Sequence, residues 1–461
     1  MLKKIGIILI IFVCIITLFA CKDDKTKPKG ELTSSYDIRA TLDVQNQAVY
    51  ATTKVTLFND TDSDLSSLAF YLYPNAHSDC RVDIGGVKCD GADLDFCLDG
   101  ANLTVTLGTP LKSGESGIYI IGTRVGVPNG NDRFALTAEG VYNLHAFFPR
   151  LAYYDGGFVI VPYSDRGDPY LFDESDFTVT LEAPLDYIVA HSGVLLKEDL
   201  GESSKLTTIQ IDGARDVAFS LSKDFKVSSG ESGGVKIAYY GEGEQGQEYV
   251  DFISTCIVDL SELIGEYPYE SFSVSESDFK HGGMEYSGYT LINKDVRDKK
   301  LVLLHELLHQ WFGLKVGSNG YAEGWLDESL VSYLSYYYMD IYNNGGYAEN
   351  IQSIKNSYDK FLSRVRAEIG DSYNPKINLS LSEFRNDEEY AYVVYDYGVL
   401  IYHGIAEVVG REKLIKGIKG YYQDMKGKVA TESDLIKCLE KHGARKMGGI
   451  MRSYLEGKVV G

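Results

Sequence analysis

The segment 305–328 contains side chains that can bind a metal ion and activate water. His305 and His309 are four residues apart, so on a helix both imidazoles project from one face and can bind a single ion. Glu306 lies between them, where it can act as the base for a water on that ion. Glu328 follows after eighteen further residues and supplies a third ligand. Two histidines and a glutamate are a standard set for catalytic zinc, which keeps a fourth position open, so we predict one zinc ion per chain.

The flanking sequence predicts the helices that hold these ligands. Asp298 is expected to cap a helix that starts at Lys299, and Gly313 is expected to stop it. The residues between them are apolar on nearly every side, which is typical of a core helix, and buried histidines need a partner such as a metal. A second helix is predicted over 327–342, with Glu328 in its first turn, where a carboxylate favours the helix dipole.

The N-terminus predicts export. Lys3 and Lys4 precede an apolar run over 5–20, and Cys21 follows it directly. A span across a bilayer needs about twenty apolar residues, so this shorter run is interpreted as a signal peptide over 1–20. It resembles a bacterial lipoprotein signal, with Cys21 lipidated after cleavage; a retained short anchor helix is the alternative. Either interpretation places the protein outside the cytoplasm, and the first anchors it by lipid to the outer face of a bacterial membrane.

The composition indicates how the protein is attached to the membrane and which class of partner it is not expected to bind. Residues 21–33 hold the lipidated cysteine and a charged segment without apolar periodicity, which is expected to be a flexible linker. The net charge of −21 would be repelled by anionic lipid, so the covalent lipid at Cys21 must hold the protein. The same acidity argues against nucleic acid as a partner. The remaining five cysteines show no metal-binding spacing and define no disulfide framework.

The periodicity of the chain changes near its middle. Residues 34–227 contain short alternating apolar runs separated by Gly, Pro, Asn and Asp, which predicts an antiparallel β domain. Residues 228–461 are expected to form an α-rich domain with a small sheet. Its helices are predicted near 249–263, 348–369, 397–409, 412–425 and 433–441. The fold class is therefore α+β, with more than one domain.

Four spaced motifs resemble those of the gluzincin aminopeptidases, the family of aminopeptidase N and leukotriene hydrolase. Residues 305–313 (HELLHQWFG) are similar to the family's HExxHxWFG run, and residues 325–328 (WLDE) resemble its WLNE box. Residues 282–286 (GGMEY) resemble its GxMEN motif, and residues 395–398 (YDYG) resemble its YEKG segment. The β-rich first half is similar to the family's N-terminal saddle domain. The resemblance implies that this domain is followed by a thermolysin-like zinc peptidase domain.

The resemblance also implies roles for residues outside the zinc helices. Tyr395 would donate a hydrogen bond to the oxyanion of the tetrahedral intermediate. Glu285 would pair with the free α-ammonium of a peptide, and Gly282, Gly283 and Met284 would allow the substrate to approach closely. The expected protein is therefore a zinc aminopeptidase that acts on peptides with free N-termini.

Three departures from the family pattern affect this expectation. Tyr286 replaces the Asn of GxMEN, so a contact with the substrate backbone is in doubt. Ser335 replaces a carboxylate that often supports a ligand histidine. Only sixty-six residues follow Tyr395, so the C-terminal helical domain of longer relatives is absent and a more open site is expected.

Two other functions stay open from the sequence. One is a zinc endopeptidase acting on exported proteins, and the other is a non-catalytic lipoprotein that binds peptides. The presence of Glu306 together with all three ligands argues against the second, because a binding protein does not need the base.

Overall fold

The computed structural model describes residues 30–77 and 79–457. The predicted signal peptide, Cys21 and most of the predicted linker lie outside the described residues. Among the described residues, no helix is both long and apolar enough to cross a bilayer. The five cysteines in this part of the chain are free thiols.

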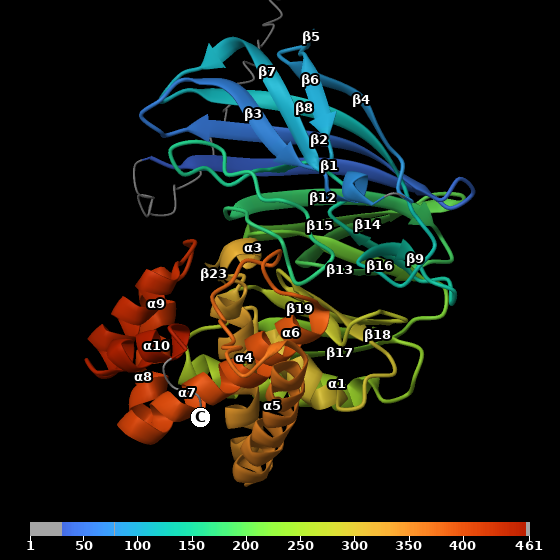
Figure 1. The fold of residues 1–461 in the computed structure, drawn as a ribbon. Coiled ribbons are helices and arrows are strands. Elements are labelled where there is room, and N and C mark those ends of the chain that lie inside the picture. The colour runs from blue at the N-terminus through green and yellow to red at the C-terminus, as the bar shows by residue number, and fades with distance from the viewer. Residues whose placement is uncertain (1–29, 78, 458–461) are drawn as a thin grey trace, which may run out of the picture.

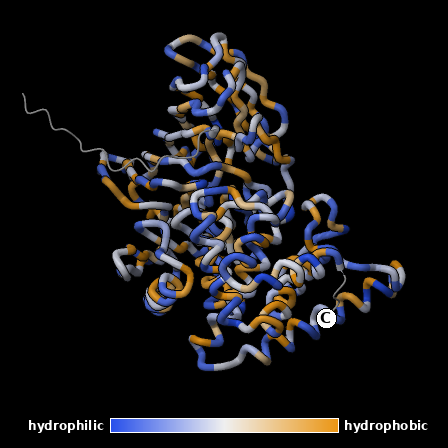
Figure 2. Tube along the Cα trace, turned by 90° about the vertical axis from the view of Figure 1, so that its left-hand side faces the viewer, coloured by the Kyte–Doolittle hydropathy of each residue, from blue (hydrophilic) through white to orange (hydrophobic). Residues whose placement is uncertain are grey.

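The first half of the chain is built from three β-sheets, which form the upper part of Figure 1. The largest has eight strands in the order β14-β15-β12-β1-β2-β8-β4-β5. Its strands in chain order are β1 (Leu32–Asp43), β2 (Ala48–Asn59), β4 (Val82–Cys89), β5 (Ala92–Asp93), β8 (Ser116–Gly126), β12 (Ser175–Pro184), β14 (Val194–Leu200) and β15 (Ser204–Ala214). Buried and exposed residues alternate along β1 and β2, because successive side chains of a strand point to opposite faces. Figure 2 shows hydrophobic and hydrophilic residues interspersed along the trace.

Two four-stranded sheets complete this domain. One has the order β13-β16-β10-β9 and consists of β9 (Phe134–Leu136), β10 (Tyr142–His145), β13 (Ile188–His191) and β16 (Ala218–Ser222). The other has the order β11-β3-β7-β6 and consists of β3 (Leu65–Tyr71), β6 (Phe96–Asp99), β7 (Asn102–Leu111) and β11 (Arg150–Leu151). The strands pair antiparallel as predicted, except that β1 and β12 pair in parallel. A parallel pair needs a long connection, and more than a hundred residues separate these two strands.

The second half contains one five-stranded sheet with the order β17-β18-β19-β21-β20. Its strands are β17 (Lys226–Ser232), β18 (Val235–Gly241), β19 (Ser271–Ser277), β20 (Gly283–Tyr286) and β21 (Tyr289–Asn293). The boundary predicted after residue 227 falls within β17, so the change of sheet begins at Lys226. A two-residue pairing of β22 (Phe312–Gly313) with β23 (Val316–Gly317) follows the zinc helix.

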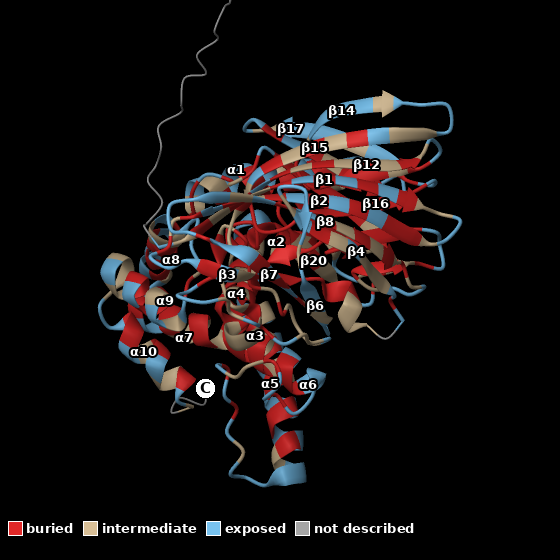
Figure 3. Ribbon diagram, turned by 90° about the horizontal axis from the view of Figure 1, so that it is seen from above, coloured by how far each residue is buried: buried red, intermediate tan, exposed pale blue. Residues whose placement is uncertain are grey.

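Helices fill the rest of the second half, in the lower part of Figure 1. They are α1 (Gly246–Leu263), α2 (Lys299–Leu308), α3 (Gly320–Glu323), α4 (Trp325–Tyr342), α5 (Tyr347–Ile369), α6 (Asp387–Tyr390), α7 (Gly398–Val409), α8 (Arg411–Met425), α9 (Glu432–Cys438) and α10 (Met447–Leu455). Two π-helical segments, Ala391–Tyr397 and Leu439–Gly443, adjoin α7 and α9. Figure 3 shows that α4 lies among buried residues, whereas the edge strand β14 is largely exposed.

The helix that carries the two histidines begins as predicted but ends earlier. Asp298 caps α2, and its side chain accepts a hydrogen bond from Leu301 N. The stop predicted at Gly313 is five residues too late, because α2 ends at Leu308. The next turns tighten to i→i−3 hydrogen bonds, from Gln310 N to Leu307 O and from Trp311 N to Leu308 O. Gly313 then reverses the chain at a φ of +105°.

Candidate active site

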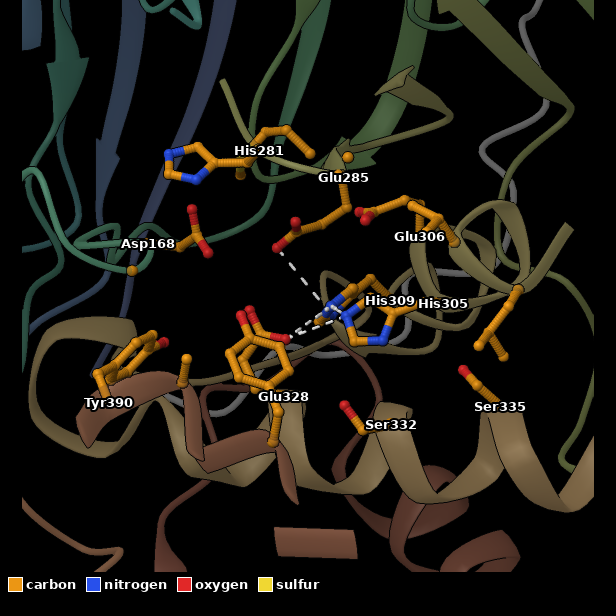
Figure 4. Close-up of a pocket in the computed structure, with 18 of the residues that line it drawn as sticks. Asp168, His281, Glu285, His305, Glu306, His309, Glu328, Ser332, Ser335 and Tyr390 are labelled. Atoms are coloured by element: carbon orange, nitrogen blue, oxygen red, sulfur yellow. Dashed lines mark hydrogen bonds and ion pairs between the residues drawn. The ribbon is translucent and has the colours of Figure 1, made fainter. Parts of the chain in front are cut away.

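Helices α2 and α4 bring the three predicted metal ligands together. Nε2 of His305 lies 3.1 Å from Oε2 of Glu328 and 3.1 Å from Nε2 of His309. Nε2 of His309 lies 3.4 Å from the same Glu328 oxygen. In a tetrahedral zinc site with bonds of about 2.0–2.1 Å, ligand atoms lie roughly 3.3 Å apart. The residues present therefore fit one zinc ion, and Figure 4 shows their side chains converging.

The two histidines differ in their support. Nδ1 of His309 donates a hydrogen bond to Phe312 O at 3.0 Å, which leaves Nε2 for the metal. No described hydrogen bond reaches Nδ1 of His305. Ser335 does not replace the missing carboxylate, because its hydroxyl donates to Val331 O of its own helix at 2.8 Å. Within the described residues, the serine at position 335 therefore leaves Nδ1 of His305 without a side-chain partner.

Glu306 lies in the same pocket and is buried. Burial raises the pKa of its carboxyl to about 8, and the negative charges of Glu328 and Asp168 add to this shift. A bound cation would oppose these effects and favour the carboxylate form that a base requires. A Cβ atom built at Gly283 would collide with Oε1 of Glu306, so the glycine makes room for this side chain. Gly282 also lines the pocket, but a Cβ there would make only ordinary contacts.

A second carboxylate accompanies Glu285, and the sequence did not indicate it. Glu285 is carried by β20, and its Oε1 lies 4.0 Å from Nδ1 of His309. Asp168 comes from the β domain and accepts a hydrogen bond from Nη2 of Arg133 at 2.5 Å. Figure 4 shows both carboxylates at the same end of the pocket. Met284, which the sequence assigned to the substrate, lines this pocket with its sulfur 3.1 Å from Nε of Arg133.

Burial raises the pKa of Glu285 well above its ordinary value. Within the described residues, its only ion-pair partner is His309, and no Lys or Arg pairs with it. A cation that enters the pocket would therefore stabilise the ionised form of Glu285.

Tyr395 lies in the π-helical segment before α7 and lines the same pocket. Its ring centroid is 6.1 Å from that of His305. Burial, followed by the negative charge of Glu328, raises the pKa of Tyr395 well above its ordinary value. The phenol therefore keeps its proton and can donate it in a hydrogen bond. Tyr390, which sequence reasoning missed, packs edge-on against it with ring centroids 6.0 Å apart.

Tyr286 does not occupy the pocket, although it stands in the GxMEN-like motif. Its side chain is 1% exposed and packs on the ring of His145, with centroids 4.4 Å apart. Its backbone oxygen accepts a hydrogen bond from Nε2 of Gln310 at 3.1 Å. The substitution therefore places an aromatic ring in the core beside Glu285 and adds no side chain to the substrate pocket.

The pocket encloses about 520 Å³ and is bounded at the Asp168 end by the β domain. Arg166 connects the two halves there, because its Nη1 donates to Leu381 O at 2.7 Å and to Phe384 O at 3.1 Å. Its Nε also pairs with Asp387 at 2.7 Å. His281 also lines the pocket, and desolvation lowers its pKa to about 4.

Comparison with known proteins agrees with this geometry. Residues 258–454 match the peptidase family M1 domain. The chain is 25% identical over 266 residues to aminopeptidase N of Lactobacillus delbrueckii subsp. lactis, which is 52% of this chain and 30% of that protein. It is 25% identical over 163 residues to tricorn protease-interacting factor F2 of Thermoplasma volcanium, which is 34% of this chain and 19% of that protein. The chain therefore spans less than a third of the length of these relatives.

A solved structure shows a similar fold. The M1 zinc metallopeptidase from Deinococcus radiodurans superposes with a TM-score of 0.72 at 17% sequence identity, covering 94% of this chain and 95% of that one. The β domain followed by a helical peptidase-type domain is thus confirmed as the fold. The resemblance to the gluzincin aminopeptidase family is also confirmed, since residues 258–454 match the peptidase family M1 domain.

Proposed function

We propose that this protein is a zinc aminopeptidase that removes N-terminal residues from peptides. The observation that carries the proposal is the pair of carboxylates, Glu285 and Asp168, at one end of the pocket beside the ligand triangle of His305, His309 and Glu328. Two anions in one half-buried corner suit an ammonium group, and loop residues of the β domain border the pocket on that side. A peptide that places its amine there presents its first peptide bond to His305, His309 and Glu328.

The side chains divide the chemistry between them. His305, His309 and Glu328 would hold a zinc ion, which would supply a Lewis acid for the scissile carbonyl and for the attacking water. Glu306 accepts a proton from that water and later gives it to the departing amine. Tyr395 donates its O–H to the oxygen that gains negative charge, and loss of one such donor typically lowers the rate by about 100-fold or more. Glu285 and Asp168 hold the α-ammonium during these steps.

Location forms a separate part of the proposal. The basic start, short apolar run and Cys21 support export and lipid attachment at the outer face of a bacterial membrane. Substrates there would be peptides at the cell surface. Replacement of Cys21 by serine should release the protein from the membrane fraction, and unchanged membrane association would contradict the lipid anchor.

The activity is tested with matched free and N-acetylated aminoacyl fluorogenic amides, on zinc-loaded protein starting at Glu31. We expect cleavage of the free-amine set alone. Glu285→Ala should lower kcat/KM for free amines by about 10-fold or more, because a charge-assisted contact is lost. Cleavage of acetylated internal peptide bonds would indicate the endopeptidase instead. No cleavage of either set by zinc-loaded protein would favour a peptide-binding role.

A further inference from the structure

The pocket continues beyond the zinc ligands, away from the end where Glu285 and Asp168 would hold the amine. In Figure 4, Asp168 and Tyr390 lie at one end, Ser332 and Ser335 lie at the other, and the ligand histidines lie between them. Side chains from three helical segments also line the pocket: Leu301, Val302, Ser332, Ser335, Tyr336 and Asp396. Tyr336 follows Ser335 on α4 and lies close enough to Asp396 for the two groups to interact electrostatically. None of these side chains is a metal ligand, and none belongs to the corner formed by Glu285 and Asp168, which we call the amine corner.

Small side chains on α4 give this end its space. Ser332 and Ser335 are three residues apart, so they share a face of the helix, and both are buried. The Ser335 hydroxyl is already satisfied by Val331 O. Leu301 and Val302 supply apolar surface to the same pocket. The space therefore suits an aliphatic chain.

Asp396 adds a negative charge to this apolar surface. It is half-buried, and among the described residues none of the ion pairs involves it. Burial raises the pKa of Asp396 to about 6, and Ser357 opposes the shift by a hydrogen bond. The carboxyl is therefore ionised near neutral pH without a cationic partner. A cation at the end of an aliphatic side chain would stabilise this half-buried carboxylate.

The direction of the peptide determines which side chain reaches Asp396. With the amine at Glu285 and the first carbonyl at the ligand triangle, the chain after the scissile bond runs toward Ser332 and Ser335. Glu306 lies on this side of Glu285 in Figure 4, as the residue that protonates the departing amine must. The second residue of the peptide is therefore the one that enters this space.

We propose that the space lined by Leu301, Ser335 and Asp396 selects peptides whose second residue is lysine or arginine. The aliphatic stem packs on Leu301 and Val302, and the cation pairs with the Asp396 carboxylate. This inference rests on the proposed aminopeptidase function, because that function sets the direction of the peptide. It makes Asp396 a residue that determines specificity and is not part of the reaction.

Binding and turnover test the inference separately. Zinc-loaded Glu306→Gln protein is titrated calorimetrically with Ala-Lys-Ala and with Ala-norleucine-Ala, which differ only in the ammonium group. We expect the lysine peptide to bind about 10-fold or more tightly, since a charged hydrogen bond contributes on this scale. Adding Asp396→Asn should bring the ratio close to one, and adding Asp396→Glu should keep the preference.

Asp359→Asn serves as the matched control. Asp359 is exposed on α5, two residues from Ser357, so the same change of charge outside the pocket should leave the ratio intact. Equal binding of the two peptides, or a preference that survives Asp396→Asn, would overturn the inference. If the two peptides bind equally and the unmutated protein hydrolyses both, the proposed function stands while the specificity fails. A lysine preference in binding without hydrolysis of either peptide would reject the proposed function and keep the cation site.

Discussion

Replacing Gln310 should separate the structural role of the zinc helix from its metal ligands. Gln310 is fully buried next to His309. Its Oε1 accepts a hydrogen bond from Gly288 N at 2.8 Å, and its Nε2 donates to Tyr286 O at 3.1 Å. One side chain thus ties α2 to the turn between β20 and β21, and β20 carries Glu285. Gln310→Met keeps the length of the side chain and removes both hydrogen bonds.

The magnitude follows from the two groups that lose their partner. Gly288 N–H and Tyr286 C=O would be left buried, and each such group costs about 1–3 kcal/mol. We therefore expect the free energy of unfolding to fall by roughly 2–6 kcal/mol. The turn should also loosen, so KM for free-amine substrates should rise more than kcat falls, because in the proposed function Glu285 holds the amine and not the reacting carbonyl.

Urea unfolding of the zinc-loaded protein measures this loss. The chain has two tryptophans, Trp311 and Trp325, and both are buried in the M1 domain, so their fluorescence reports on that domain. Gln423→Met is the control, since Gln423 is exposed on α8 and surface changes usually stay within about 0.5 kcal/mol. If Gln310→Met shifts the unfolding free energy no more than the control does, the two hydrogen bonds do not support the site as argued.

Three further predictions concern the pocket itself. Glu306→Gln should abolish turnover while leaving one zinc per chain by elemental analysis; full activity in this variant would remove Glu306 as the base. Ser335→Glu should raise zinc affinity about 10- to 100-fold by giving Nδ1 of His305 a carboxylate partner, measured by competition with a chelating dye; unchanged affinity would contradict the missing support. The preference for lysine over norleucine should grow between pH 5 and pH 7, because Asp396, with a pKa of about 6, is neutral below this value and anionic above it. A preference that is flat over this range in the unmutated protein, measured as a ratio of kcat/KM values, would argue against Asp396 as the partner.

Local features explain why the zinc helices were predictable. The Asp298 cap, the spacing of His305 and His309, and the position of Glu328 in a first turn depend on residues a few positions apart. The strands of the β domain were predictable for a similar reason, since alternation along a single strand marks its buried face. The structure places both helices within a few residues of the expected ranges.

Long-range features were not predictable from one sequence. The parallel pairing of β1 with β12 and the approach of Asp168 and Arg133 to the zinc ligands depend on how the two halves dock. No local pattern marks Asp168, because a loop carboxylate is ordinarily solvated. The π-helical turn that carries Tyr395 was also missed, since an i→i+5 turn has no distinct periodicity over seven residues.

Docking of the two halves decides which part of the site each half provides. Arg215 of the β domain donates from Nε to Leu314 O at 2.5 Å and from Nη2 to Lys428 O at 2.9 Å. Next to it, Asp216 accepts a hydrogen bond from Ser287 N at 2.7 Å, just after β20. The β domain therefore fixes the loops that follow both the zinc helix and the Glu285 strand, and it contributes Asp168 to the amine corner. In the proposed function, zinc would be held by α2, the turn that follows it and α4, whereas recognition of a free amine would need both halves in contact. Selectivity for N-termini would then depend on docking more strongly than metal binding would.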